Sequence, residues 1–249
     1  MEVHHPHHIT HKKKWSEYLL EFFMLFLAVF LGFIAENIRE NSVERHREHQ
    51  YLQSLVSDLK EDTTVLRYQL EQHKNSIVMM DSFITILNNL SLVRNEGNDL
   101  YYFGRIAPRL RTFTANMTTY EQLKNSGSFR LISDAEISEK IINYYQAVLH
   151  MRQLEDIYAS EFVDYKRIAA QVFEPSVFQK QESGEDDVAR FTDNPQLQNT
   201  DPKLLKQLCI YAIYMNGSRR TIVRYNERLL KAASDLINCL QKEYHLNNS

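Results

Sequence analysis

Glycine and proline are scarce in this chain, at 6 and 5 of 249 residues. Both residues mark tight turns, so their scarcity argues against a turn-rich β architecture and favours long helices. Cysteine is scarcer still, because only Cys209 and Cys239 are present. Two cysteines cannot build a disulfide framework, and they leave the redox compartment open.

An excess of positive charge is also missing. The formal net charge is -3, so the composition gives no electrostatic reason to expect nucleic acid as a partner. The chain contains no Gly-x-Ser-x-Gly, His-Glu-x-x-His, phosphate-binding glycine loop or Cys-x-x-Cys motif. We therefore expect a protein without enzymatic activity and without a cofactor.

One long apolar run stands out near the amino terminus. Residues Phe22–Ala35 carry no charge, and extending the run back to Tyr18 adds only Glu21. Eighteen helical residues span ~27 Å, close to the thickness of the hydrocarbon core of a bilayer. Trp15 and Tyr18 lie where aromatic side chains anchor a span at the membrane interface. The sequence predicts a transmembrane helix over residues 15–38, with the lipid bilayer as a partner.

Two alternatives fit this run less well. A cleaved signal peptide needs small residues before the cut, and a cut after Ala35 places Phe33 at a position that requires one. A buried helix of a soluble domain has a polar face, which this run lacks. Orientation follows from charge: the lysines of residues 12–14 are denser and closer to the span than the arginines beyond it. We expect a flexible His/Lys-rich tail over residues 1–14 in the cytoplasm and residues 39–245 outside it.

Three further segments contain apolar seams, that is, rows of apolar residues along one face of a helix, and these predict three long helices. The first continues from the span, with apolar residues at steps of three and four from Leu52 to Leu87. The second begins with a capping box of Ser133 and Glu136. The third begins with Asp201 as N-cap and proline at the first helical position, and its seam passes the Asn-Gly pair at 216–217 without losing phase.

The connections between these seams contain the remaining glycines and prolines. Residues 93–117 are expected to be irregular, and residues 174–200 to form a polar mobile loop. A short helix, residues 119–125, is expected to begin with a capping box of Thr118 and Glu121 and to end at a left-handed Gly127. The fold class is therefore all-α: one N-terminal transmembrane helix continuing into an elongated antiparallel bundle of three long helices plus one short helix, over residues 39–245.

Three stretches resemble a known group of proteins. These are Glu21 with the polar "ENIRE" after the apolar run, "YLQSLVSDLKED" from Tyr51, and "TTYEQLKNSGSFRLISDAEISEKIINYY" from Thr118. The chain resembles a family of uncharacterised single-pass membrane proteins, a domain of unknown function common in Bacteroidota-type bacteria. The family usually has Trp where Ile38 stands here. The resemblance implies a membrane location and a helical domain, and it implies no reaction. Together with the orientation inferred from charge, it leads us to expect a bacterial inner-membrane protein whose helical domain lies in the periplasm.

Arginines and one turn supply the candidate binding residues. The first arginine cluster is Arg105, Arg109 and Arg111, and the second, at helical spacing, is Arg220, Arg224 and Arg228. Either cluster can bind phosphate, lipid headgroups or an acidic partner, although most such arginines pair with acids on a neighbouring helix. The turn at Asn125, Ser126 and Gly127 is either a ligand site or a tight corner between two helices.

Histidines offer weaker candidates. His4, His5, His7, His8 and His11 form a tract that can bind Zn²⁺, Ni²⁺ or Cu²⁺ without a fixed geometry, and His46 and His49 lie one helical turn apart. We expect no structured metal site. The sequence favours a membrane-anchored scaffold or partner-binding protein, with Ala28 and Gly32 as a possible contact for self-association. The alternative is a ligand-sensing or unrecognised enzymatic domain with a site inside the bundle.

Overall fold

The computed structural model describes residues 14–182 and 188–246, which form helices and connecting segments without a β-strand. The helices are α1 (Trp15–Leu87), α2 (Leu90–Asn95), α3 (Gly97–Ile106), α4 (Thr118–Asn125), the 3-10 helix η1 (Ser128–Leu131), α5 (Ala135–Val172), α6 (Pro175–Lys180) and α7 (Pro202–Glu243). The all-α prediction is confirmed.

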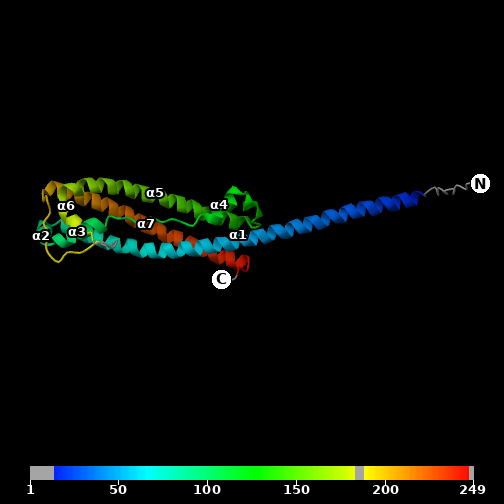
Figure 1. The fold of residues 1–249 in the computed structure, drawn as a ribbon, viewed down its shortest axis with the longest axis horizontal. Coiled ribbons are helices and arrows are strands. Elements are labelled where there is room, and N and C mark those ends of the chain that lie inside the picture. The colour runs from blue at the N-terminus through cyan, green and yellow to red at the C-terminus, as the bar shows by residue number, and fades with distance from the viewer. Residues whose placement is uncertain (1–13, 183–187, 247–249) are drawn as a thin grey trace, which may run out of the picture. The chain divides into compact units, whose positions relative to one another are not determined.

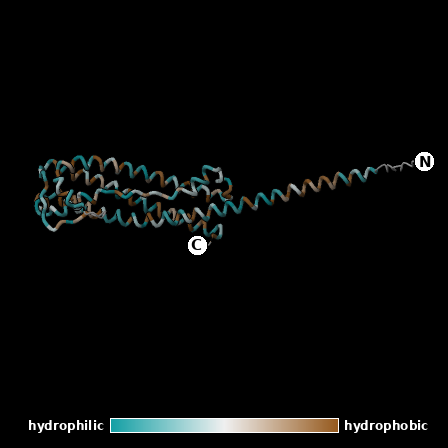
Figure 2. Tube along the Cα trace, in the orientation of Figure 1, coloured by the Kyte–Doolittle hydropathy of each residue, from teal (hydrophilic) through white to brown (hydrophobic). Residues whose placement is uncertain are grey.

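The chain divides into two units, Met1–Gln50 and Tyr51–Ser249, and α1 contributes residues to both. In the first unit the apolar side chains of α1 are exposed. Figure 2 shows a hydrophobic stretch of the chain near the amino-terminal end of α1. This helix is long and apolar enough to cross a membrane, and an N-terminal signal sequence shares those properties.

The second unit contains three long helices that lie lengthwise beside one another: α1 from Tyr51 onward, α5 and α7 (Figure 1). Two ion pairs show the direction in which α7 runs relative to α1. Lys74 pairs with Glu227 at 2.8 Å, and Asp81 pairs with Arg220 at 2.6 Å. Because the residue numbers rise on α1 as they fall on α7, the two helices are antiparallel.

The core of the second unit consists of two apolar clusters. One contains Phe83, Tyr165 and Leu208, and the other contains Leu59, Ile141 and Leu236. Between the two clusters, α1 buries Gln69 and His73, and α7 buries Asn226. A polar layer therefore interrupts the core at mid-length.

An extended segment, residues 107–117, runs along the bundle between α3 and α4 (Figure 1). Its main-chain groups pair with side chains from all three long helices. Gln69 on α1 donates to the Thr112 carbonyl at 2.8 Å, and the amide of Phe113 donates to Glu155 on α5 at 2.8 Å. Further along, the amide of Asn116 donates to Asp62 at 2.7 Å. Buried backbone groups need such partners, so these polar side chains allow an extended chain to lie within a helical bundle.

Several predicted helix ends are confirmed and several are wrong. Asp201 caps α7 by accepting from the Lys203 amide at 2.9 Å, α7 continues through residues 216–217, and Gly127 is left-handed with φ of 67°. The Ser133 capping box is wrong, because Asp134 is the N-cap of α5 and accepts from the Glu136 amide at 2.8 Å. The box at Thr118 is also wrong, since α4 begins at Thr118 itself and Met117 precedes it without a side-chain cap.

The predicted connectors are partly helical. Residues 93–117 were expected to be irregular, but α2 and α3 occupy the stretch up to Ile106. Asn89 caps α2 through its side chain, which accepts from the amides of Ser91 and Leu92. Within residues 174–200, α6 follows its N-cap Glu174, and Asn194 accepts from the Gly97 amide at 2.7 Å. The mobility of this segment remains a prediction, and residues 183–187 lie outside the described part.

The second unit should fold without lipid. A fragment of residues 44–245 keeps the polar pairings described above and both apolar clusters. We expect far-ultraviolet circular dichroism of this fragment in detergent-free buffer to show a strongly helical spectrum with cooperative thermal loss. A random-coil spectrum would show that the bundle depends on the first unit.

Candidate functional site

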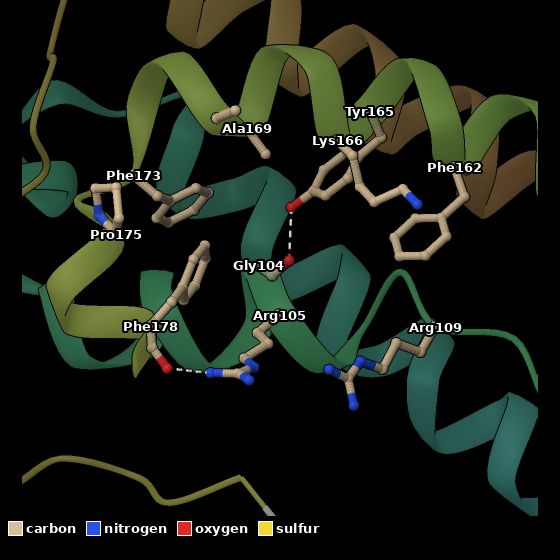
Figure 3. Close-up of a pocket in the computed structure, with 11 residues that line it drawn as sticks. Gly104, Arg105, Arg109, Phe162, Tyr165, Lys166, Ala169, Phe173, Pro175 and Phe178 are labelled. Atoms are coloured by element: carbon tan, nitrogen blue, oxygen red, sulfur yellow. Dashed lines mark hydrogen bonds between the residues drawn. The ribbon is translucent and has the colours of Figure 1, made fainter. Parts of the chain in front are cut away.

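A pocket opens between α3, α5 and α6 in the second unit (Figure 3). It has a volume of about 360 Å³, which is within the usual range for small-molecule sites. Its lining combines apolar walls with the cations Arg105, Arg109 and Lys166. The pocket is therefore suited to a molecule with an apolar body and a negative charge.

Aromatic side chains form the walls. Phe173 and Phe178 lie together, with ring centroids 4.9 Å apart, and Tyr165 donates to the Gly104 carbonyl at 2.7 Å. Gly104 permits this packing, because a Cβ at that position would lie 2.6 Å from the Phe173 ring. The walls are thus set by contacts between α3, α5 and the segment that enters α6.

Arg105 lies at the edge of the pocket and has three partners. One terminal nitrogen donates to the Phe178 carbonyl, and the other pairs with the Glu182 carboxylate at 2.9 Å. The guanidinium also lies 5.6 Å from the centre of the Phe178 ring. With a side-chain exposure of 14%, Arg105 is the more enclosed member of its pair with Glu182, whose side chain is 70% exposed.

Arg109 and Lys166 have fewer partners. Among the described residues, the side chain of Arg109 has no ion pair or hydrogen bond, and Lys166 contacts only the Phe162 ring, at 4.8 Å. Figure 3 shows Arg105 and Arg109 on the α3 side of the pocket and Lys166 on α5. Within the described residues, neither of these two cationic groups has an acidic partner.

The turn that carries Arg109 is held from inside the bundle. Arg219 on α7, which is fully buried, donates to the Arg109 carbonyl at 2.8 Å and to the Tyr158 hydroxyl. Tyr158 in turn donates to the Pro108 carbonyl at 2.8 Å. Burial raises the pKa of Tyr158 to about 12, so its hydroxyl stays protonated as a donor. Arg219 and Tyr158 thus fix the main chain while the Arg109 side chain remains at the pocket.

The structure separates the arginines that the sequence grouped. Arg105 and Arg109 line one pocket and Arg111 does not, although Arg109 and Arg111 are both exposed. On α7, Arg220 pairs with Asp81, as expected for an arginine facing a neighbouring helix. Arg224 donates to Thr221 at 3.0 Å, and Arg228 lies over the Tyr225 ring.

Sequence reasoning missed Lys166 and Arg219. Lys166 lies off the apolar seam of α5, where nothing distinguishes it from a solvated lysine. Arg219 could have been found, because the seam of α7 steps from Met215 to Ile222 and Arg219 occupies the seam position between them. A charged residue at a seam position indicates a buried polar contact.

The turn at Asn125, Ser126 and Gly127 is exposed. Ser126 donates to the Gln122 carbonyl at 2.6 Å, and Asn125 lies 3.4 Å from the Glu121 carboxylate. Local contacts thus account for both polar side chains, and a ligand at this turn remains a prediction.

The histidine candidates gain no structural support. His46 contacts Gln50 on the same helix at 3.1 Å, and His49 is exposed. In the described part of the chain, no three His, Cys, Asp or Glu side chains are placed to hold a metal. The tract of His4, His5, His7, His8 and His11 lies outside the described residues.

Comparisons with protein-family models, with curated proteins and with solved structures find no match for this chain.

Proposed function

We propose that this chain is a membrane-anchored binding module whose helical domain takes an anion with an apolar body into the pocket between α3, α5 and α6. The observation that carries the proposal is the placement of Arg105, Arg109 and Lys166 around a cavity walled by aromatic rings. Cations next to apolar walls bind such anions by combining charge attraction with burial of apolar surface.

The anchor is part of the proposal. The apolar stretch of α1 crosses the bacterial inner membrane once, with the residues before it in the cytoplasm and the second unit in the periplasm. The resemblance to single-pass membrane proteins of Bacteroidota-type bacteria and the density of lysines before the span support this orientation. The module is a binding protein rather than an enzyme, because the pocket offers fixed charge and apolar walls.

A partner-binding scaffold is the second candidate function. Ile210, Ile213 and Tyr214 lie on one exposed face of α7, with exposures of 52%, 45% and 66%. Apolar residues at this spacing on an exposed helix face favour docking of another protein, including a second copy of the chain. Crosslinking of the full chain in native membranes, with Tyr214→Glu as the disrupting variant, tests this role.

Removal of the Arg109 charge should weaken anion binding. Full-length protein in lipid nanodiscs, titrated with naphthalene sulfonate by calorimetry against empty nanodiscs, is expected to bind one equivalent. Arg109→Gln should weaken this binding by about tenfold, since a charge-assisted contact contributes roughly 1.5 kcal/mol or more.

Arg111→Gln is the matched control, because Arg111 is an exposed arginine on the same segment that does not line the pocket. It should leave the affinity within about twofold of the unmodified protein. Equal losses in both variants would indicate nonspecific charge attraction, and the absence of any binding would overturn the proposed function.

A further inference from the structure

We propose that the pocket selects a monocarboxylate with an apolar body, and that Glu182 occupies the position of the ligand carboxylate on Arg105 when the pocket is empty. This inference rests on the proposed function and adds both the headgroup chemistry and an internal competitor. The Glu182 carboxylate meets Arg105, which lines the pocket, at 2.9 Å, although Glu182 is not itself one of the lining residues.

The contact with Glu182 shows which groups of Arg105 remain available to an anion. The Phe178 carbonyl already takes one terminal nitrogen of the guanidinium, and the Phe178 ring covers its face. The other terminal nitrogen meets Glu182. A planar carboxylate needs only such a restricted set of donors, whereas a phosphate presents three acceptor oxygens.

The charges at the pocket also favour a monocarboxylate ligand. In the described part of the chain, the cations that line the pocket are Arg105, Arg109 and Lys166, and Glu182 is the carboxylate that pairs with one of them. A monocarboxylate that displaces Glu182 exchanges one singly charged acceptor for another and leaves Arg109 and Lys166 to add attraction. A doubly charged phosphate loses more hydration energy on entering a pocket with aromatic walls, so its entry costs more.

Displacement of Glu182 is easy on physical grounds. Its side chain is 70% exposed, and ion pairs with exposed partners contribute little, typically less than about 1 kcal/mol. A ligand that also buries its apolar body against Tyr165, Phe173 and Phe178 gains the free energy of burying apolar surface, which Glu182 does not gain. Glu182 therefore lowers the apparent affinity without closing the site.

The test compares Glu182→Gln with the unmodified full-length protein in nanodiscs. Titrations use naphthoate, naphthyl phosphate and the neutral naphthamide, which share one apolar body and differ in the headgroup. We expect naphthoate to bind more tightly than naphthyl phosphate, naphthamide to bind most weakly, and Glu182→Gln to tighten naphthoate binding roughly fivefold by removing the competitor. Glu139→Gln removes an exposed carboxylate near the other end of α5 and should change the affinity by less than about twofold.

The outcomes separate this inference from the proposed function. Suppose that naphthalene sulfonate binding depends on Arg109, but Glu182→Gln leaves naphthoate binding unchanged or weaker. Glu182 then does not compete with the ligand for Arg105, and the proposed binding function still holds. Tighter binding of naphthyl phosphate than of naphthoate would overturn the ligand class. If no naphthyl anion binds to the unmodified protein or to Glu182→Gln, both proposals fail.

Discussion

Replacement of Asp62 by alanine is expected to lower the free energy of unfolding of the second unit by about 4 kcal/mol. Asp62 is almost fully buried and accepts from the Asn116 amide at 2.7 Å and from the Tyr144 hydroxyl at 2.7 Å. Alanine leaves the buried Tyr144 hydroxyl and the half-buried Asn116 amide without acceptors, and each orphaned donor costs about 2 kcal/mol. Denaturant titration of the full chain in nanodiscs, followed by far-ultraviolet circular dichroism, measures the loss.

Two variants show whether this loss comes from the buried donors. Asp62→Asn keeps one acceptor oxygen and should lose roughly half as much. Glu61→Ala removes the neighbouring carboxylate, which contacts the exposed side-chain amide of Asn116 at 2.8 Å, and should cost less than about 0.5 kcal/mol. Similar losses for Asp62→Ala and Glu61→Ala would mean that the contacts of the extended segment do not stabilise the bundle.

The long helices could be predicted because their signals are local. In α7, apolar residues at steps of three and four set the buried face, and Asp201 followed by Pro202 sets the first turn. The error at Ser133 also has a local cause. Asp134 follows Ser133 directly and competes for the same cap, and asparagine or aspartate caps at least as well as serine.

The extended segment could not be predicted, because its partners are distant in the sequence. Asp62 and Gln69 resemble solvated polar residues, and periodicity assigns them no role. Glu155 interrupts the apolar seam of α5, which indicates a buried polar contact but does not identify the partner. The role of all three residues depends on the main chain of residues 112–116, which is 42 or more residues away for each of these pairs. Sequence spacing within a helix carries no information on such a pairing.

The pocket was predicted in part for the same reason. Arg105 and Arg109 were predicted as binding residues, but they were grouped with Arg111 in a segment that was expected to be irregular. The apolar walls come from Tyr165, Phe173 and Phe178, and the third cation comes from Lys166. Only the packing of α5 and α6 against α3 brings these groups together, so the sequence indicated anion binding without indicating a cavity.

Acid should destabilise the second unit through His73. Burial in the polar layer, with a smaller effect of the positive charge on Arg219, lowers the pKa of His73 from 6.5 to about 4. Between pH 6.5 and 4 the unfolded chain therefore binds a proton at this site that the folded chain does not bind. Above pH 6.5, His73 is neutral in both the folded and the unfolded chain and the second unit keeps its full stability from this site. The free energy of unfolding should fall by about 3 kcal/mol as the pH drops from 6.5 to 4.

Buried carboxylates act in the opposite direction, so a difference measurement is required. Burial raises the pKa of Asp62 and of Glu155, and a raised carboxyl pKa favours the folded state as the pH falls. Denaturant titrations at several pH values should therefore compare the unmodified chain with His73→Gln, in which the acid-dependent loss should be smaller by about 3 kcal/mol. His150→Gln, at an exposed position on α5, is the matched histidine replacement. Parallel pH profiles for His73→Gln and the unmodified chain would show that His73 already titrates normally in the folded state, and that the polar layer admits enough water to solvate its charge.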